Sequence, residues 1–189
     1  MGDDASLTAR KAQLRRSCIA ARDAVGPNPR AVAATRLFAR MWGLRGRTIA
    51  GYLPIGSEAD PTGVMRVLSR DNRICVPVVT GKGAPLRFRE WTPGCALETG
   101  PFGVSVPTDG GWRVPDLLIV PMVGFDAAGG RLGYGGGFYD RTLSGLRDAD
   151  VVGFALEAQR IDAVPAGRHD ITLPWIVTDA GVFGTGAEV

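Results

Sequence analysis

The sequence predicts an α/β protein, built as a single three-layer α/β/α domain with a mostly parallel, Rossmann-like sheet. Short apolar runs, typical of strands buried on both faces, alternate with longer segments of helical periodicity. The chain has 189 residues, enough for one domain with a sizeable core, and contains no evident linker, so residues 1–189 are expected to form one domain. A hydrophobic content of 45% with 22% charged residues excludes a disordered or fibrous chain.

Four segments have the periodicity and the end signals of helices. Ser6 is a candidate cap for the first helix, and the turn-forming residues Gly26 to Pro29 are expected to end it. Pro61 is suited to the first turn of the third helix, and the fourth helix follows a run of glycines. The expected helices cover residues 7–25, 30–42, 61–68 and 137–146.

Six apolar runs have the length of strands, and the strongest of them extends from Asp116 to Pro121. Residues 92–115 are rich in glycine and proline and are expected to form an irregular loop with one short strand. Ligands in open parallel sheets bind beyond the carboxyl ends of strands, so a site is expected after Leu53, Val120 or Leu156. The expected strands cover residues 48–53, 73–79, 86–91, 116–121, 151–156 and 176–178.

The net charge and the cysteine content limit the possible classes of function. The net charge is +3, a small excess that permits nucleic-acid binding without arguing for it. The three cysteines are far apart and form no CxxC motif, which argues against a zinc site and indicates free thiols in a reducing compartment. The chain has neither an apolar run of about 20 residues nor the pattern of a signal peptide. We therefore expect a cytoplasmic protein with no membrane or nucleic-acid partner.

Six glycines lie within the nine residues from Gly129 to Gly137, just before the fourth expected helix. Glycine lets the backbone approach a ligand closely, and successive N–H groups at a helix start can cradle an anion. Arg131 could clamp a phosphate in this loop, and Asp140 could hold Mg²⁺ against that phosphate. The segment fits neither the P-loop nor the dinucleotide fingerprint. On composition alone a flexible surface loop is an equally open interpretation, although the Arg, Tyr and Asp side chains among the glycines favour phosphate binding.

Basic residues on the first expected helix form a second candidate site. Lys11 and Arg15 are four residues apart and therefore share one helical face, and Arg22 follows seven residues later. Two cations on one face could grip a polyphosphate. The alternative is a solvated basic face, which such a pair forms in most helices.

Acidic residues in two expected loops are further candidates. Glu58 follows a predicted strand and could accept hydrogen bonds from an amino-heterocycle, or it could be a helix-start acid before the third helix. Asp170 could be a second metal ligand, or a turn residue. Its neighbour His169 is the only histidine in the chain, which excludes a metal site with two histidines.

The segment from Asp116 to Asp140 closely resembles the signature of the 5-formyltetrahydrofolate cyclo-ligase family, also called 5,10-methenyltetrahydrofolate synthetase. In this chain the signature reads Asp116-Leu-Leu-Ile-Val-Pro121, then Gly124-Phe-Asp126, then Gly129-x-Arg-Leu-Gly-Tyr-Gly-Gly-Gly-Phe-Tyr-Asp140. The resemblance extends over nearly the whole chain, and several ordered motifs make it more specific than one glycine-rich loop. The other matching elements are Lys11-x-x-x-Arg15, Tyr52-Leu53-Pro54 with Glu58, Gly100-Pro101-Phe102-Gly103 with Pro107, Gly153-x-Ala155 with Gln159, Pro165 with His169-Asp170, and Val177-Thr178-Asp179.

This resemblance implies a three-layer α/β domain and a reaction. With Mg²⁺ as cofactor and ATP as co-substrate, such an enzyme converts 5-formyltetrahydrofolate to 5,10-methenyltetrahydrofolate and releases ADP and phosphate. The formyl oxygen attacks the γ-phosphate of ATP, and N10 of the folate then closes onto the activated carbon. No side chain has to act as a covalent nucleophile, because phosphoryl transfer mainly needs positioning and charge neutralisation.

The resemblance also implies roles for individual residues. Arg131 and Tyr139 would be catalytic, and Asp140 and Asp170 would hold Mg²⁺. The residues expected to bind ATP are Lys11, Arg15, Arg131, Gly133, Tyr134, Gly135, Gly136, Gly137, Phe138 and Tyr139. The residues expected to bind the folate are Leu53, Glu58, Tyr134, Gly135, Gly136, Gly137 and Phe138.

Three positions depart from the pattern of some family members. Tyr134 and Gly136 stand where those members carry Arg and Lys, and Phe138 replaces a Tyr that many members have. The γ-phosphate would therefore depend more on the backbone of the loop and on Arg131. A phosphate-binding role for the side chains at the departing positions is put in doubt.

Two other functions stay open at this point. One is a nucleotide-dependent paralogue that acts on another formylated or amide-bearing metabolite. The other is a non-catalytic anion- or RNA-binding module that uses the basic residues of the first helix, and it would give no reason for Asp140 and Asp170. For the enzyme, the expected partners are the small molecules reduced folate and ATP, and the protein is expected to be a monomer.

Overall fold

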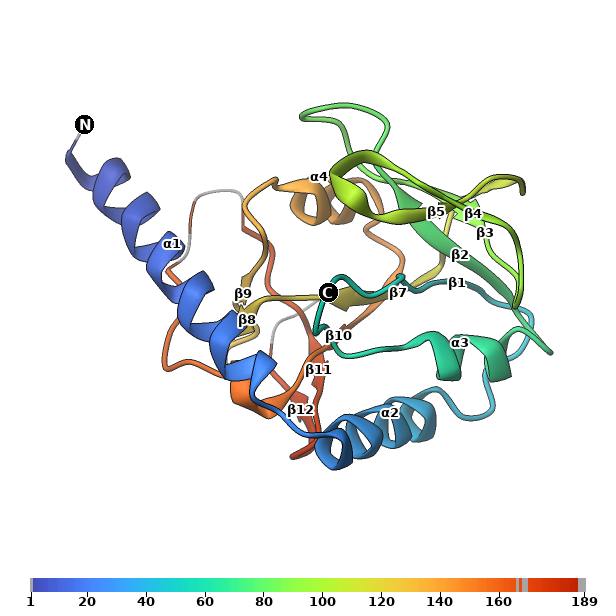
Figure 1. Cartoon of the computed structure of the whole chain (residues 1–189), viewed down its shortest axis with the longest axis horizontal. Coiled ribbons are helices and arrows are strands. Elements are labelled where there is room, and N and C mark those ends of the chain that lie inside the picture. Colours follow the sequence, from blue (N-terminus) through green and yellow to red (C-terminus); the bar gives the residue numbers. More distant parts are fainter. Residues whose placement is uncertain (1, 166, 168–169, 187–189) are drawn as a thin grey trace.

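A central eight-stranded sheet with α-helices on both of its faces organises this computed structural model (Figure 1). The structure describes residues 2–165, 167 and 170–186. Within those residues, no helix combines the length and the apolar character needed to cross a membrane. The helices are α1 (Gly2–Asp23), α2 (Pro27–Met41), α3 (Thr62–Leu68) and α4 (Phe138–Gly145).

The sheet has the strand order β12-β11-β10-β7-β1-β2-β3-β6. The inner strands from β11 to β2 pair in parallel, whereas β12, β3 and β6 pair antiparallel at the two edges. This confirms the predicted α/β fold with a mostly parallel sheet. The strands are β1 (Thr48–Ala50), β2 (Arg73–Val78), β3 (Arg87–Glu90), β6 (Trp112–Arg113), β7 (Leu117–Pro121), β10 (Asp150–Phe154), β11 (Trp175–Val177) and β12 (Val182–Gly184).

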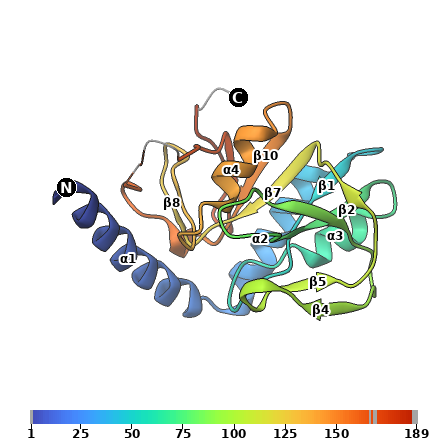
Figure 2. The same cartoon turned by 90° about the horizontal axis from the view of Figure 1, so that it is seen from above.

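Alternate residues of the central strands fill two separate cores. Ile49 and Ile119 belong to a cluster that packs under α2 and α3, whereas Ala50 and Leu118 belong to a cluster on the α4 side. Figures 1 and 2 show the same arrangement, with α2 and α3 on one face of the sheet and α4 on the other. The near-continuous apolar sequence of β7 follows from this burial, because both of its faces are covered.

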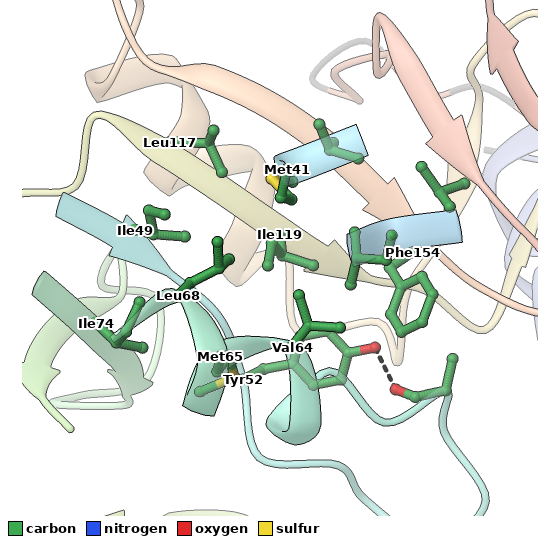
Figure 3. Packing of buried hydrophobic residues seen from close by; sticks show 14 of the residues in the cluster. Met41, Ile49, Tyr52, Val64, Met65, Leu68, Ile74, Leu117, Ile119 and Phe154 are labelled. Carbon is green, nitrogen blue, oxygen red and sulfur yellow. Dashed lines mark hydrogen bonds between the residues drawn. The ribbon is translucent and has the colours of Figure 1, made fainter. Parts of the chain in front are cut away.

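The core under α2 and α3 also fixes the chain that leaves β1 (Figure 3). Tyr52 is buried among these apolar residues, and its hydroxyl donates a hydrogen bond of 2.5 Å to the carbonyl oxygen of Ala59. Gly51, the residue before Tyr52, leaves room for Met65, since a Cβ at Gly51 would lie 2.5 Å from the Met65 sulfur. The hydrogen bond between Tyr52 and Ala59 joins the two ends of the segment that carries Glu58.

Several predicted boundaries need correction. Ser6 lies inside α1 and does not cap it, since the helix begins at Gly2. The predicted turn at residues 26–29 ends α1, but α2 already begins at Pro27, because proline is tolerated in a first helical turn. The first strand ends at Ala50, so Leu53 lies in the loop after it.

The region predicted as an irregular loop, residues 92–115, contains more structure than expected. It forms the hairpin of β4 (Leu97–Thr99) and β5 (Ser105–Pro107) as well as the edge strand β6. All residues of β4 are exposed, so the strand has no apolar alternation that a sequence pattern could detect. The prediction also missed β12 and the short hairpin of β8 (Gly124–Phe125) and β9 (Arg131–Leu132).

Candidate active site

The candidate residues gather beyond the carboxyl ends of the parallel strands, where ligands bind in open α/β sheets. The segment with Glu58 follows β1, and the glycine-rich loop follows β7 through the β8–β9 hairpin. α1 packs against β8 and against the 3₁₀ turn Glu157–Gln159 that follows β10. Helix α1 thereby brings its basic side chains to the same edge of the sheet.

The glycine-rich loop joins β9 to α4 and depends on backbone conformations that favour glycine. Gly135 and Gly137 have φ values of 97° and 64°, and Gly137 is the residue that caps the start of α4. Arg141 of α4 donates a hydrogen bond of 2.6 Å to the carbonyl oxygen of Gly136. A Cβ at Gly136 would lie 2.6 Å from the ring of Phe138. The conformation of the loop therefore depends on its glycines and on contacts with α4.

Gly137→Ala is expected to lower the free energy of unfolding by about 1–2 kcal/mol, because a side chain at this φ is strained. The Cβ would also lie 2.7 Å from Nη1 of Arg141. Urea unfolding followed by circular dichroism measures the change. Gly133→Ala is the control, since its Cβ would meet no described atom within 4 Å, and a shift within about 0.5 kcal/mol is expected. An unchanged stability of Gly137→Ala would contradict the left-handed conformation of this residue in the loop.

Arg131 and Asp140 form a largely buried ion pair at the base of the loop. Nη2 of Arg131 lies 2.6 Å from Oδ1 of Asp140, and the two side chains are 5% and 21% exposed. The guanidinium carbon also lies 5.8 Å from the ring centroid of Tyr139. Burial lowers the pKa of Arg131, and the negative charge of Asp140 opposes this shift.

Nε of Arg131 is buried without a hydrogen-bond partner among the described residues. Buried donors are nearly always paired in folded proteins, so an unpaired one calls for an explanation. An anionic ligand at this position would supply the missing acceptor.

Lys11 and Arg15 both reach from α1 toward this loop region, as their shared helical face predicts. Lys11 makes an ion pair of 2.7 Å with Asp170. Arg15 donates a hydrogen bond of 2.7 Å to the carbonyl oxygen of Gly133, and a Cβ at Gly135 would lie 3.3 Å from its guanidinium. These contacts contradict the alternative interpretation, in which Lys11 and Arg15 form a solvated basic face.

Asp140 and Asp170 lie close to one another in the fold. The backbone N–H of Ile171, the residue after Asp170, donates a hydrogen bond of 3.1 Å to Oδ1 of Asp140. Burial alone would raise the pKa of Asp170, but hydrogen bonds from Lys11 and from the N–H of Gly167 hold that pKa below its ordinary value. His169 lies outside the described residues.

Two neighbouring carboxylates suit Mg²⁺, which is bound in enzymes by one or two carboxylates together with substrate phosphates. Across the described residues there is no cluster of three His, Cys, Asp or Glu side chains that could form a complete metal cage. A metal ion here would therefore need further oxygen ligands from a bound substrate or from water. The donor set of Asp140 and Asp170 fits that requirement.

Glu58 is buried in the segment after β1, in contact with the glycine-rich loop. Its Oε2 accepts a hydrogen bond of 2.8 Å from the N–H of Ile55, and its Oε1 accepts one of 2.9 Å from the hydroxyl of Tyr134. Burial raises the pKa of Glu58, and these hydrogen bonds together with the charge of Arg22 oppose the shift. Glu58 is thus not an ordinary helix-start acid. Leu53 is half-buried against the core under α2 and α3.

The structure does not support Arg22 as a residue that binds polyphosphate, the role for which the sequence makes it a candidate. Its side chain is only 4% exposed. Its Nε donates to the hydroxyl of Ser57 at 2.9 Å and its Nη1 to the hydroxyl of Tyr134 at 3.3 Å. An RNA-binding surface on α1 would therefore lack one of its basic residues.

Phe102 is a side chain near the site to which the sequence assigned no individual role. Its ring meets that of Phe138 edge-on, with centroids 5.8 Å apart, although Phe102 is 73% exposed. Its φ of 60° is uncommon for a residue with a side chain. The flanking Gly100-Pro101 and Gly103 signal a tight turn, but not its contact with α4.

Comparison with known proteins decides the family. Residues 7–179 match the 5-formyltetrahydrofolate cyclo-ligase family. The chain belongs to this family. It is 31% identical to the 5-formyltetrahydrofolate cyclo-ligase of Mycolicibacterium smegmatis, over 89% of this chain and 93% of that protein. It is 34% identical to the cyclo-ligase of Escherichia coli K12, over 80% of this chain and 88% of the relative.

A solved structure gives the same result for the fold of this cyclo-ligase family member. The 5,10-methenyltetrahydrofolate synthetase of Aquifex aeolicus superimposes with a TM-score of 0.78 and 27% identity, covering 95% of this chain and 94% of that chain. The resemblance found in the sequence is thus confirmed, and the protein is an enzyme of the ligase class.

Proposed function

We propose that this cyclo-ligase family member converts 5-formyltetrahydrofolate to 5,10-methenyltetrahydrofolate in a reaction that consumes ATP and requires Mg²⁺. The observation that supports the proposal is that two ion pairs lie beside the glycine-rich loop. Lys11 with Asp170 and Arg131 with Asp140 place two cations and two carboxylates at the same edge of the sheet. The cations suit the phosphates of ATP, and the carboxylates suit a metal ion that accompanies those phosphates.

ATP is proposed to bind across α1 and the glycine-rich loop. Lys11 and Arg15 would hold its phosphates from one side, and Arg131 would meet the γ-phosphate with the unpaired Nε as a donor. The positive φ values of Gly135 and Gly137 support backbone contacts with the phosphates. The full proposed set is Lys11, Arg15, Arg131, Gly133, Tyr134, Gly135, Gly136, Gly137, Phe138 and Tyr139.

Asp140 and Asp170 are proposed to hold Mg²⁺. When bound, the ion would neutralise charge on the phosphates and polarise the phosphorus for attack. Each carboxylate is held by a cationic side chain and by a backbone N–H. Its side chain would therefore lose little conformational freedom when the metal ion binds. Arg131 and Lys11 are thereby placed next to both the metal ligands and the proposed phosphate site.

The folate is proposed to bind on the other side of the loop, next to the segment after β1. Glu58 would accept hydrogen bonds from the N–H groups of the pterin, since a carboxylate has lone pairs beyond the two that Ile55 and Tyr134 use. Leu53 and Phe138 offer apolar surface for the ring. The full proposed set is Leu53, Glu58, Tyr134, Gly135, Gly136, Gly137 and Phe138.

The chemistry follows from this placement. The formyl oxygen attacks the γ-phosphorus, and the bond to the β-phosphate oxygen breaks to release ADP. N10 then attacks the activated carbon and loses its proton, and phosphate leaves with the former formyl oxygen. Arg131 would neutralise charge on the transferred group. Burial raises the pKa of Tyr139, so its phenol stays protonated and could donate a hydrogen bond there.

Spectrophotometry of the purified protein with 5-formyltetrahydrofolate tests this function. Methenyl product, followed by its near-ultraviolet absorbance, is expected only when both ATP and Mg²⁺ are present. A folded protein that binds ATP but forms no product would favour a paralogue acting on another formylated or amide-bearing metabolite. Steep salt-dependent binding of RNA without turnover would instead favour a nucleic-acid module.

Glu58→Gln is expected to raise the KM for the folate by about 10- to 100-fold, because a hydrogen bond to a charged group contributes about 1.5–3 kcal/mol. The KM for ATP is expected to stay within about twofold. Steady-state kinetics with each substrate varied in turn measures both. Asp60→Asn, at a nearby exposed acid, is the control. Equal effects on the two KM values would count against a pterin role for Glu58.

We further propose that residues 1–189 form one domain that acts as a monomer in the cytoplasm. Three free cysteines, two of them buried, support a reducing compartment.

A further inference from the structure

Arg22, Tyr134 and Glu58 are linked by hydrogen bonds in a chain that joins three segments of the protein, with Arg22 and Glu58 buried and Tyr134 half-exposed. Arg22 lies in the last turn of α1, Glu58 follows β1, and Tyr134 belongs to the glycine-rich loop. Nη1 of Arg22 lies 4.0 Å from Oε1 of Glu58, too far for a good direct hydrogen bond. The hydroxyl of Tyr134 contacts both groups, at 3.3 Å from Nη1 of Arg22 and 2.9 Å from Oε1 of Glu58.

The direction of this chain is fixed by the chemistry of its members. A guanidinium can only donate hydrogen bonds, so Arg22 must donate to the hydroxyl oxygen of Tyr134. The single hydroxyl hydrogen is then free to point to Glu58. Both carboxylate oxygens of Glu58 are thus held by donors, Tyr134 on one and the N–H of Ile55 on the other.

Arg22 is itself held firmly by contacts outside this chain. Its Nε donates to the hydroxyl of Ser57, which in turn contacts the carboxylate of Asp23. Arg30 of α2 donates to the carbonyl oxygens of Arg22 and Ser57, at 2.8 and 2.7 Å. The side chains of Arg22 and Arg30 therefore join the end of α1 to the loop that carries Glu58.

We propose that Arg22 is a positioning residue for the folate site, which acts through the hydroxyl of Tyr134 to orient the Glu58 carboxylate. The proposal rests on the proposed pterin role of Glu58. Arg22 itself would touch neither substrate. It also gives Tyr134 a role that does not involve phosphate, at a position where some family members carry Arg.

A dependence on pH follows from the groups that face Glu58. These are Arg22 from α1, Tyr134 from the loop, Tyr52 from the segment after β1 and Tyr139 from α4. Burial raises the pKa of Glu58, and Arg22 is among the groups that oppose this. Without the guanidinium the pKa would rise further, so the carboxylate would be lost at a higher pH and folate binding would weaken from the acid side.

Kinetics of Arg22→Gln across pH tests the proposal. The KM for the folate is expected to rise about tenfold near neutral pH, and the acid limb of kcat/KM for the folate should move to higher pH. The KM for ATP should change little. Arg22→Lys keeps the positive charge but loses the planar set of guanidinium donors. The acid limb of its kcat/KM for the folate should therefore lie near that of the wild type, while its KM for the folate stays raised. Arg16→Gln, at an exposed arginine of α1, is the control.

Circular dichroism and thermal melts establish that each variant is folded before its kinetics are read. Tyr134→Phe serves if Arg22→Gln does not fold, because it removes only the hydroxyl and should also raise the KM for the folate. A folded Arg22→Gln with unchanged folate KM and acid limb would overturn the proposal. Equal losses for ATP and folate would do the same, since they indicate a general structural role. A wild-type protein that forms no methenyl product would overturn the proposed function itself.

Discussion

Asp140→Asn is expected to lower kcat by about a thousandfold at ordinary Mg²⁺ concentrations. A metal ion supplies several kcal/mol of charge stabilisation, and about 1.4 kcal/mol corresponds to a tenfold rate change. Asparagine can still accept the hydrogen bonds from Arg131 and from the N–H of Ile171. Alanine would leave the Arg131 charge without a partner, and breaking a buried pair in this way costs about 3–5 kcal/mol.

The dependence of the rate on Mg²⁺ concentration separates a metal ligand from a structural residue. For Asp140→Asn, half-maximal activity should need more Mg²⁺, while the melting temperature falls by much less than for Asp140→Ala. Asp148→Asn, at an exposed aspartate beyond α4, should behave like the wild type. A variant at Asp140 with the wild-type rate and the wild-type Mg²⁺ dependence would remove this residue from the proposed metal site.

Arg131→Met is expected to lower kcat/KM for ATP by about a thousandfold or more, the range found for arginines that stabilise phosphoryl-transfer transition states. The guanidinium is buried, its Nη2 is paired with Asp140, and its Nε has no partner among the described residues. Arg131→Lys should recover only a small part of the loss, since an ammonium cannot replace two donors in a planar fork. Steady-state and single-turnover kinetics measure both variants.

Arg66→Met, at an exposed arginine of α3, controls for the loss of one positive charge. Because removal of Arg131 also leaves Asp140 without its ion pair, the folded fraction of each variant has to be measured by urea unfolding. Wild-type kcat in folded Arg131→Lys would show that charge alone suffices at this position. Wild-type kcat in folded Arg131→Met would contradict a catalytic role.

Elements with buried, continuous apolar sequence could be predicted well. The run from Asp116 to Pro121 is predicted as a strand and forms β7 near the centre of the sheet, with Leu117 to Val120 buried. The glycine-rich segment before Phe138 was predicted to precede a helix, and α4 begins at that residue. The exposed strand β4 was missed because exposure leaves no periodic pattern to detect.

Contacts between distant residues could not be predicted from local patterns. Arg22 and Tyr134 are 112 positions apart, and Tyr134 and Glu58 are 76 apart. The spacing of Arg22 from Arg15 places it near the same helical face, but only the packing of α1 decides that Arg22 is buried whereas Arg15 meets the glycine-rich loop. Family resemblance likewise assigns residues to a site without showing which of them hold one another.

Transfer of the formyl oxygen to phosphate is the measurement that tests this account most directly. The protein would be given ATP, Mg²⁺ and 5-formyltetrahydrofolate labelled with ¹⁸O in the formyl group, and the released phosphate would be analysed by mass spectrometry. The account predicts one ¹⁸O atom in the phosphate for each methenyl product formed. Methenyl product accompanied by unlabelled phosphate would contradict phosphorylation of the formyl oxygen, and the absence of product would contradict the proposed reaction.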